Sequence, residues 1–405
     1  MKELLKNFLP QFVISFYHFI LAFLGALIYG FPSKKLTLIG VTGTNGKTTT
    51  TEMIAAIFEK AGKKIALLNS IRFKIGEKEE INKLRMTMPG RFFIQRFLKK
   101  ATKEGCEYAI IEVTSEGIKQ HRHRFLDFKV AVFTNLAPEH IEAHGSFEKY
   151  REAKLKLFEA TKEIHVINIE DENADYFLRT LAKKKITFGL EKGDFNLKNT
   201  ETKIQIPGKF NLYNALAAFS VAKTLGIEEG IIKEALREFK GVPGRMEEVI
   251  SRPFKVIVDY AFTPNALEKV YQTLINLKPK TYNPKPKIIC VLGSCGGGRD
   301  KWKRPVLGEL AAKYCDEVIV TNEDPYDEDP WQIIGEVAEG TKGKARKILD
   351  RREAIREALK LAKEGDIVVI TGKGAEPSIV EKGKKIPWDD RKVVKEEFQK
   401  IYEKI

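Results

Sequence analysis

The chain has 405 residues, of which 43% are hydrophobic and 31% are charged, so it is long enough for two or three folded domains and too apolar for a disordered protein. Its 70 basic residues exceed the 55 acidic ones by 15, a surplus that suits an anionic partner. We do not expect nucleic acid, because no aromatic-studded basic motif, zinc-finger spacing or arginine-rich tail is present. Four cysteines without a CxxC pair exclude a disulfide framework and favour a cytoplasmic protein.

The first feature along the chain is an uncharged apolar stretch. Residues 8–31 contain no Asp, Glu, Lys or Arg and have lysines on both sides. A helix of this length can span a bilayer, although Pro10, Ser15 and two glycines dilute the stretch. The sequence leaves three interpretations open: membrane attachment, either spanning the bilayer or lying in its interface on the inner face; packing on the chain's own fold; or packing on a partner subunit. No cleavage site stands out, so a removable signal peptide is not expected.

A phosphate-binding loop is predicted immediately afterwards. Residues 36–41 are an apolar strand, the sequence G-T-N-G-K-T follows at 43–48, and a helical pattern continues to residue 58. Glycines allow backbone N–H groups to approach phosphate oxygens, the helix N-terminus adds its dipole, Lys47 supplies charge, and the Thr48 hydroxyl can bind magnesium. The strict P-loop spacing is not met, because Val41 stands where the first glycine would be.

Two further groups of polar residues follow predicted buried strands. Glu112 comes near the end of the strand at 108–113, where the carboxyl end of a parallel strand points into the ligand crevice, and it suits a magnesium ion. Four of the six histidines, at positions 121, 123, 140 and 144, invite a zinc interpretation. We favour a crevice position for His140 instead, because the cluster has no cysteine partner and His140 follows the strand at 130–134.

The alternation of strands and helices predicts two doubly wound α/β domains. The first, residues 36–242, contains the phosphate loop, and the second, residues 243–405, has strands near 255–258, 288–292, 317–320 and 367–370. Residues 1–35 form a hydrophobic N-terminal helix and linker ahead of them. Closure of the second domain over the first would exclude water from a reactive intermediate.

Eleven short motifs in order give the chain a family resemblance. They are G-T-N-G-K-T (43–48), T-M-P (87–89), E-V-T-S (112–115), T-N with E-H (134–140), Y-R-E-A-K (150–154), G-K-F-N-L-Y-N (208–214), G-R-M-E (244–247), D-Y-A (259–261), G-G-G-R-D-K-W-K-R-P (296–305), G-K-G with Glu376 (372–376) and D-D-R (389–391). With these motifs the chain resembles the Mur ligases, the ATP-dependent amide ligases of peptidoglycan precursor synthesis, and is most similar to the MurE type. The match covers residues 29–400.

The resemblance implies an ADP-forming carboxylate–amine ligase that adds an amino acid to a UDP-MurNAc-peptide-like carboxylate through an acyl phosphate, with ATP and Mg²⁺. It assigns ATP binding to Gly43, Thr44, Asn45, Gly46, Lys47, Thr48, Thr49, Asn211, Asn214, Arg245 and Asp259. It assigns magnesium to Thr48, Glu112, His140 and Lys154, and catalysis to Lys47, His140, Lys154 and Arg304. The lysine is carbamylated in relatives; whether it is so here is open, and an unmodified Lys154 would instead offer its charge to the acyl phosphate. It assigns the substrates to Thr87, Ser115, Arg304, Glu323, Asp324, Gly372 and Glu376.

The chain also departs from the family pattern. Tyr326 stands where relatives that add meso-diaminopimelate carry an arginine, so the added amino acid is open, and Glu139 replaces an aspartate. Relatives have an N-terminal domain that holds the uridine nucleotide, and about 35 mostly apolar residues stand in its place here, so the carrier of the acceptor is open too. Histidines usual in the family are replaced by Glu116, Phe262 and Ala375.

Two alternatives remain at this point. One is a ligase of the folylpolyglutamate or cyanophycin type, which shares the loop and the reaction but not the acceptor. The other is a membrane-tethered ATP-binding protein without catalysis, against which the retained Lys47, Glu112, His140 and Lys154 argue.

Overall fold

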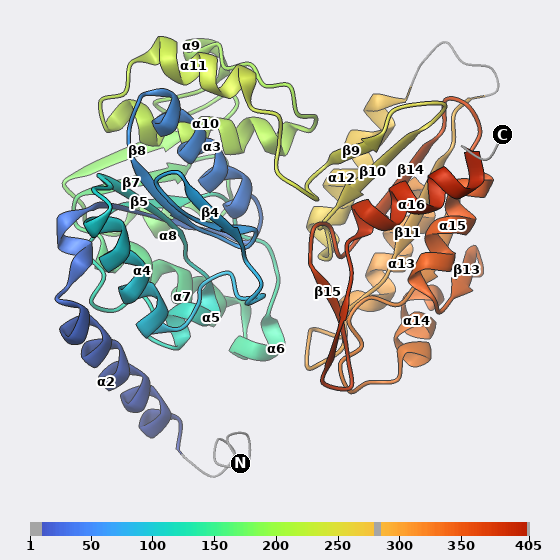
Figure 1. Cartoon of the computed structure of the whole chain (residues 1–405), viewed down its shortest axis with the longest axis horizontal. Coiled ribbons are helices and arrows are strands. Elements are labelled where there is room, and N and C mark those ends of the chain that lie inside the picture. Colours follow the sequence, from blue (N-terminus) through green and yellow to red (C-terminus); the bar gives the residue numbers. More distant parts are fainter. Residues whose placement is uncertain (1–9, 279–284, 403–405) are drawn as a thin grey trace. The chain divides into compact units, whose positions relative to one another are not determined.

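The structure, a computed structural model, describes residues 10–278 and 285–402. The chain divides into two compact units (Figure 1). The first comprises the residues up to Pro138, Ser146–Gln205 and Phe210–Lys240, and the second comprises Glu139–Gly145, Ile206–Lys209 and the residues from Gly241 onward. Each unit has a sheet and a hydrophobic core of its own.

Eight strands form the sheet of the first unit: β1 (Thr37–Thr42), β2 (Ile65–Leu68), β3 (Arg72–Ile75), β4 (Lys78–Ile81), β5 (Tyr108–Glu112), β6 (Phe128–Phe133), β7 (Ile164–Asn168) and β8 (Lys184–Phe188). Their order is β4-β3-β2-β5-β1-β6-β7-β8. β1 lies in the middle and pairs in parallel with β5 and β6, whereas β3 and β4 form an antiparallel edge. The central strands are buried on both faces, as in parallel sheets covered by helices on both sides.

The helices of the first unit are α2 (Gln11–Tyr29), the 3₁₀ helix η1 (Pro32–Lys35), α3 (Lys47–Lys60), α4 (Arg91–Lys103), α5 (Ser115–Lys119), α7 (Phe147–Ala160), α8 (Ala174–Leu178), α9 (Leu197–Thr200), α10 (Lys209–Thr224) and α11 (Glu229–Glu238). The α3 helix is buried along most of its length and packs against β5 and α11. Aromatic packing fills the core on the α7 and α8 side, where the rings of Phe133 and Phe177 stack with centroids 3.8 Å apart.

The second unit has a six-stranded sheet with the order β13-β12-β11-β14-β10-β9 and a separate hairpin of β15 and β16. The strands are β9 (Glu247–Ile250), β10 (Lys255–Asp259), β11 (Ile288–Leu292), β12 (Glu317–Thr321), β13 (Ala345–Ile348), β14 (Ile367–Thr371), β15 (Ser378–Glu381) and β16 (Lys384–Pro387). The helices are α6 (Ile141–His144), α12 (Pro264–Leu277), α13 (Lys303–Tyr314), α14 (Pro330–Glu339), α15 (Arg351–Leu361) and α16 (Asp390–Tyr402).

The predicted fold class, two doubly wound α/β domains preceded by an apolar helix, is confirmed. Each strand expected from the sequence begins and ends within two residues of an observed strand. The agreement is close because buried parallel strands are short apolar runs bounded by glycine or polar residues, which are easy to recognise in a sequence.

The apolar stretch near the N-terminus forms the helix α2. It ends at Gly30, whose left-handed conformation (φ 71°) lets its N–H bond to the carbonyl of Leu27. It packs against α4 of the same unit. Its segment Phe12–Tyr29 is long and apolar enough to cross a membrane by length and composition, and only 17% of that segment is buried. The structure therefore shows a helix packed on its own fold that keeps most of its apolar surface exposed.

Candidate functional site

The loop between β1 and α3 has the shape of an anion cradle. Gly46 (φ 84°) and Gly43 (φ 149°) adopt backbone conformations that side chains rarely adopt. Side chains would also collide with the surroundings: a Cβ at Gly43 would lie 2.0 Å from Thr134 Oγ1, and one at Gly46 would lie 2.2 Å from Asn214 Oδ1. The loop opens directly onto the N-terminus of α3, where the helix dipole favours a phosphate.

Residues that follow β6 hold this loop in place. The backbone N–H groups of Thr44 and Asn45 donate to the backbone oxygen of Asn135 (2.8 Å) and to its Oδ1 (3.0 Å). Thr134 Oγ1 donates to the Asn45 carbonyl at 2.7 Å, and the hydroxyls of Thr44 and Tyr150 lie 3.1 Å apart. The loop is therefore pre-organised by the neighbouring strand.

Two lysine side chains converge on the loop. Lys47 Nζ donates to the carbonyls of Gly43 (3.0 Å) and Thr44 (2.9 Å). Lys154, on α7 and only 2% exposed, donates to the same Gly43 carbonyl at 2.7 Å, and its ammonium lies 4.6 Å from the centroid of the Tyr150 ring. Two ammonium groups at one carbonyl form a strongly positive spot beside the N-terminus of a helix, which suits a polyphosphate.

Glu112 lies at the carboxyl end of β5, and its backbone pairs with Val41 at the end of β1. The carboxylate is fully buried, and Ser70 Oγ, just after β2, donates to its Oε2 at 2.8 Å. The hydroxyls of Ser70 and Thr87 are 2.9 Å apart, so these two side chains and Glu112 form one polar chain. Ser70 was not predicted from the sequence. The signal that could have found it is its position just after the carboxyl end of a short buried strand, the same end of the sheet where Glu112 lies.

The two asparagines predicted to contact adenine lie together on α10, and both are buried. Asn214 Nδ2 donates to Asn211 Oδ1 at 3.2 Å, and Thr50 Oγ1 donates to Asn214 Oδ1 at 3.4 Å. Because Asn214 also lies against Gly46, α10 is connected to the phosphate loop. Thr48 and Thr49 are buried in the first turn of α3, and Ser115 is buried at the start of α5.

In the second unit, His140 lies at the start of the short helix α6 in a left-handed conformation (φ 57°). Asp300 accepts hydrogen bonds from the first N–H groups of this helix, those of Ile141 (3.3 Å) and Glu142 (3.1 Å). The adjacent Glu139, where relatives have an aspartate, forms a buried ion pair with Lys303 at 3.3 Å. Burial raises the pKa of Glu139, against the lowering effect of Lys303. The His140 backbone is thus fixed by an acid cap and an ion pair.

The carboxylate of Asp259, at the end of β10, accepts hydrogen bonds from backbone N–H groups of the second unit. Its two oxygens accept from the N–H groups of Met246 (2.7 Å) and Ala261 (2.6 Å), and burial raises its pKa. The guanidinium of Arg245 lies over the Tyr260 ring, 4.2 Å from its centroid. Arg245 and Asp259 are therefore neighbours: Asp259 binds the N–H of Met246, which follows Arg245, and Arg245 lies over Tyr260, which follows Asp259.

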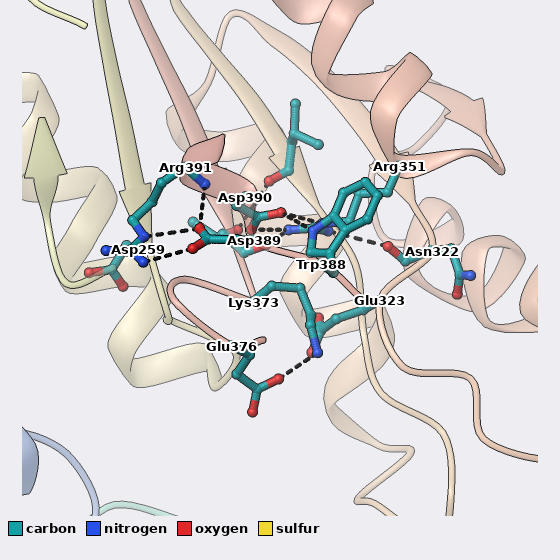
Figure 2. Close-up of polar contacts among 12 residues, drawn as sticks. Asp259, Asn322, Glu323, Arg351, Lys373, Glu376, Trp388, Asp389, Asp390 and Arg391 are labelled. Carbon is teal, nitrogen blue, oxygen red and sulfur yellow. Dashed lines mark hydrogen bonds and ion pairs between the residues drawn. The ribbon is translucent and has the colours of Figure 1, made fainter. Parts of the chain in front are cut away.

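Acidic and basic side chains gather around the loop after β14 (Figure 2). Lys373 is fully buried and forms ion pairs with Asp324 (2.9 Å) and Glu376. Glu376 also accepts a hydrogen bond from Tyr260 at 2.9 Å. Glu323 is 2% exposed, and a Cβ at Gly372 would lie 2.5 Å from its Oε2. Four of the predicted substrate residues, Glu323, Asp324, Gly372 and Glu376, are thus neighbours.

Only one of the two carboxylate oxygens of Glu323 forms a hydrogen bond with another described residue. Its Oε1 accepts from the Cys295 thiol at 2.8 Å, whereas its buried Oε2 has no hydrogen-bond partner among the described residues. Burial raises the pKa of this carboxyl group. A buried acceptor without a donor is costly, so this oxygen is available to a donor from a ligand.

The fifth predicted substrate residue of this unit, Arg304, is engaged elsewhere. Its guanidinium is buried and binds Glu336 (2.7 Å), Glu328 (2.9 Å) and the Cys295 carbonyl (3.2 Å). Two carboxylates already neutralise it, so it has the setting of a structural arginine. Arg299 ends the glycine-rich stretch 293–299 that, with Arg304, resembles the family's pocket for the incoming amino acid. It hydrogen-bonds to Tyr326 and interacts electrostatically with Cys295 and Tyr260, the partners of Glu323 and Glu376.

The D-D-R motif forms a structural link (Figure 2). Asp390 accepts two hydrogen bonds from Arg351 (2.9 and 2.8 Å) and one from Trp388 Nε1 (2.8 Å), and both members of the ion pair are buried. Asp389 binds Arg391 in the same way at 2.9 and 2.7 Å.

As for zinc, residues 10–278 and 285–402 contain no group of three or more His, Cys, Asp or Glu side chains able to hold a metal ion.

Comparison with known proteins agrees with this geometry. The model of the Mur ligase middle domain matches residues 41–222, and that of the Mur ligase glutamate ligase domain matches residues 244–374. A relative from Syntrophomonas wolfei, named UDP-N-acetylmuramoyl-L-alanyl-D-glutamate--2,6-diaminopimelate ligase, is 41% identical over 404 residues, which is 93% of this chain and 81% of that protein. The chain belongs to the Mur ligase family. An Aquifex aeolicus relative of this Mur ligase with the same name is 39% identical and covers 91% of the chain and 78% of that protein.

Comparison with solved structures also finds similarity to Mur ligases. A structure titled as a UDP-N-acetylmuramoyl-L-alanyl-D-glutamate--2,6-diaminopimelate ligase has a TM-score of 0.59 and 30% identity, covering 91% of this chain and 79% of that one. Folylpolyglutamate synthase from Mycobacterium tuberculosis has a TM-score of 0.68 but 17% identity, covering 86% and 91%, which shows a shared fold alone. The Mur ligase is therefore an ATP-dependent acid–amine ligase of peptidoglycan precursor synthesis, as the resemblance implied.

Proposed function

We propose that this Mur ligase phosphorylates the peptide carboxylate of a UDP-MurNAc-peptide-like precursor with ATP and joins an amino acid to the resulting acyl phosphate. The bond formed is an amide, and ADP and phosphate leave. The observation that best supports this is the convergence of Lys47 and Lys154 on the Gly43 carbonyl at the N-terminus of α3. Relatives at 41% and 39% identity are named for this reaction with 2,6-diaminopimelate.

The first unit supplies the groups that phosphoryl transfer needs. The transition state spreads negative charge over the transferred group, so catalysis consists mostly of positioning and charge neutralisation. The N–H groups of the 43–48 loop and the ammonium of Lys47 bind the phosphates, while Asn211 and Asn214 bind adenine. If Lys154 is unmodified, its ammonium places a second positive charge at the same point; if it is carbamylated, it becomes an anionic oxygen ligand instead. Arg245 and Asp259 keep the nucleotide roles that the family resemblance predicts.

Magnesium fits the polar chain at the end of β5. Mg²⁺ prefers oxygen ligands, and the Thr48 hydroxyl and the Glu112 carboxylate are oxygen donors at the ends of adjacent elements. When bound, the ion neutralises charge on the phosphates. Ser70 donates to the Glu112 carboxylate and orients it, and Thr87 in turn hydrogen-bonds to Ser70. The second ion that the resemblance predicts would use His140 and a carbamylated Lys154.

We assign recognition of the incoming amino acid to the cluster around Glu323 in the second unit. The buried Glu323 and the partly exposed Glu376 suit an ammonium group, and Arg299 suits a carboxylate. Tyr326 lies next to Arg299 at the position where diaminopimelate-adding relatives carry an arginine, so it shapes the far end of the amino acid site. Arg304, which the resemblance assigns to catalysis and substrate binding, also supports the loop through the Cys295 carbonyl.

We place the enzyme in the cytoplasm, with residues 36–242 as the ATP-binding domain, residues 243–405 as the C-terminal domain and residues 1–35 as a segment that associates with the inner face of the membrane. Its substrates are small molecules, namely a muramyl-peptide-like carboxylate and an amino acid.

The test is release of phosphate from ATP that depends on both an acceptor and an amino acid. Purified full-length protein is assayed with UDP-linked and lipid-linked muramyl dipeptides against the twenty common amino acids and diaminopimelate. Lys47→Ala should reduce acceptor-dependent turnover at least about 100-fold, because it removes a charge that neutralises the transferred phosphoryl group. Lys60→Ala, at the far end of the same helix in exposed pairs with Glu234 and Glu238, is the matched control and should retain full activity.

Two results would contradict the proposal. One is turnover that no acceptor stimulates above the rate with ATP alone. The other comes from an acceptor labelled with ¹⁸O in its carboxylate, since an acyl phosphate requires that one labelled oxygen leave with the phosphate. If the released phosphate carries no label, the carboxylate was not the group phosphorylated.

A further inference from the structure

The α2 helix exposes an apolar face that is unusually large for a protein in water. Its segment Phe12–Tyr29 has a mean hydropathy of 2.0, and nine of its large apolar side chains are between 37% and 73% exposed. Contiguous apolar patches of this kind mark binding surfaces. The exposed side chains are Phe12, Phe16, Tyr17, Phe19, Ile20, Phe23, Leu24, Leu27 and Ile28.

The opposite face of α2 is fixed to the first unit. Ala22 and Ala26 are buried there, and the ring of Phe92 on α4 lies against Gly25. The two polar side chains of this face also have partners: Ser15 hydrogen-bonds to His121 at 2.7 Å, and His18 accepts from Arg91 at 2.8 Å. The helix is therefore held along its length by specific packing and hydrogen bonds.

Positive charge lies at both ends of α2. Lys34 and Lys35 follow it in η1 and are exposed, and the Lys99 ammonium is close to Gly30. At the other end, the cations Arg124, Lys156 and Arg91 lie near His121, the partner of Ser15. Burial and these cations lower the pKa of His121. The first turn of the helix contains no acidic residue, and neither does the rest of it. An apolar face between two groups of cations is complementary to an anionic lipid surface, which attracts basic residues by about 1 kcal/mol each.

We propose that α2 binds an anionic lipid surface as an in-plane ridge of the first unit, with its exposed face in the interface and its packed face on α4. The docked helix does not span the bilayer, because Ser15 and His18 are bonded to side chains of the folded unit. A second copy of the chain is the less suitable occupant, since pairing two such faces would bring cations of the same sign together. This inference rests on and deepens the membrane association proposed above for residues 1–35, and it is independent of the ligase chemistry.

The test is flotation of the full-length protein with vesicles of phosphatidylcholine alone or mixed with phosphatidylglycerol. We expect binding to the mixed vesicles, at least about tenfold weaker binding to the neutral ones, and release of the bound protein by high salt. The triple variant Phe16→Ser, Leu24→Ser, Ile28→Ser should lose about tenfold or more in binding. The matched control changes three exposed apolar residues elsewhere, Leu181→Ser, Trp331→Ser and Ile386→Ser, and should bind like the unaltered protein.

A second variant tests the electrostatic part. Lys34→Gln with Lys35→Gln leaves the apolar face intact and should weaken binding to anionic vesicles several-fold without changing binding to neutral ones. The proposal is overturned if the triple serine variant floats like the unaltered protein, or if binding resists both salt and alkaline carbonate, as a spanning helix would. It is also overturned if the protein does not bind the mixed vesicles; a dimer that the triple variant dissociates would then identify a second copy as the occupant. Thermal unfolding of each variant verifies that it is folded.

Discussion

Ser70 shows how a residue that touches no phosphate can still control the proposed magnesium site. Its hydroxyl donates to Glu112 Oε2 and thereby orients a carboxylate that is completely buried. Ser70→Ala removes that donor, and we expect it to lower kcat about tenfold and to raise the Mg²⁺ concentration required for half-maximal activity, because groups that orient a metal ligand typically account for about 10- to 100-fold. The measurement is the Mg²⁺ dependence of acceptor-stimulated phosphate release.

Ser70→Thr provides the control for this prediction, since it restores the hydroxyl and should recover most of the activity at low Mg²⁺. A purely structural role would make Ser70→Ala less stable without changing its Mg²⁺ dependence. That outcome would contradict a positioning role for Ser70.

His123 should make the first unit sensitive to mild acid. Burial, with smaller contributions from Arg124, His121 and Lys156, lowers its pKa to about 3 in the folded protein, against 6.5 for an ordinary histidine. Between these values the unfolded chain binds a proton that the folded chain does not, so stability falls as the pH falls from 6.5. His123→Leu removes this titration. It should reduce the slope of the free energy of unfolding against pH by up to about 1.4 kcal/mol per pH unit. Urea unfolding between pH 4.5 and 8 measures it, and equal slopes for both proteins would refute the prediction.

At the residue scale, the sequence predicted best the groups whose backbone defines the site. Glycines 43 and 46 and Lys47 lie in the loop and helix start after β1, and Glu112 is the last residue of β5, so local order along the chain predicts where they lie. The partners of these groups come from distant segments. Neither the Ser70–Glu112 hydrogen bond nor the position of Arg299 beside Tyr326 leaves a local pattern. The engagement of Arg304 by Glu328 and Glu336 likewise depends on tertiary packing.

Among the secondary-structure elements, β14, α15 and α16 are joined by one buried ion pair. Arg351 at the start of α15 binds Asp390 at the start of α16 and also donates to the Thr371 carbonyl at the end of β14 (2.8 Å). Arg351→Met leaves the carboxylate of Asp390 buried without its counter-charge, and we expect a loss of about 3–5 kcal/mol in the free energy of unfolding. Urea denaturation followed by tryptophan fluorescence measures it.

A surface pair is the control for that prediction. Lys255 and Glu248 are 2.9 Å apart with both side chains about two-fifths exposed, so Lys255→Met should cost less than about 1 kcal/mol. If both substitutions have the same effect, burial is not what makes the Arg351–Asp390 pair important.

The strands were easier to predict than the helix contacts. Runs such as 288–292 and 367–370 are apolar because both faces of a parallel strand are covered. The docking of α2 on α4 was one of three open interpretations, since composition does not reveal that Ser15 and His18 find partners some 70 to 106 residues away.

For the whole molecule, two sheets with two cores predict two unfolding transitions. All three tryptophans, at positions 302, 331 and 388, belong to the second unit, so fluorescence reports that unit, whereas far-UV circular dichroism reports both. Phe177→Ala, in the core of the first unit, should lower the free energy of unfolding of that unit by about 3–5 kcal/mol, as measured by dichroism. The midpoint of the fluorescence transition should stay unchanged. Ile355→Ala, in the core of the second, should shift the fluorescence curve. Superimposable curves for both variants would mean a single cooperative molecule.

The docking of α2 also has a consequence during synthesis on the ribosome. The helix is translated before its partners Arg91 and His121, which follow 73 and 106 residues after His18 and Ser15. At 5–20 residues per second that interval is roughly 4 to 21 s. During this time the nascent chain presents an apolar segment with nothing to cover it, so chaperones and membrane-targeting factors compete for it before the rest of the first unit exists.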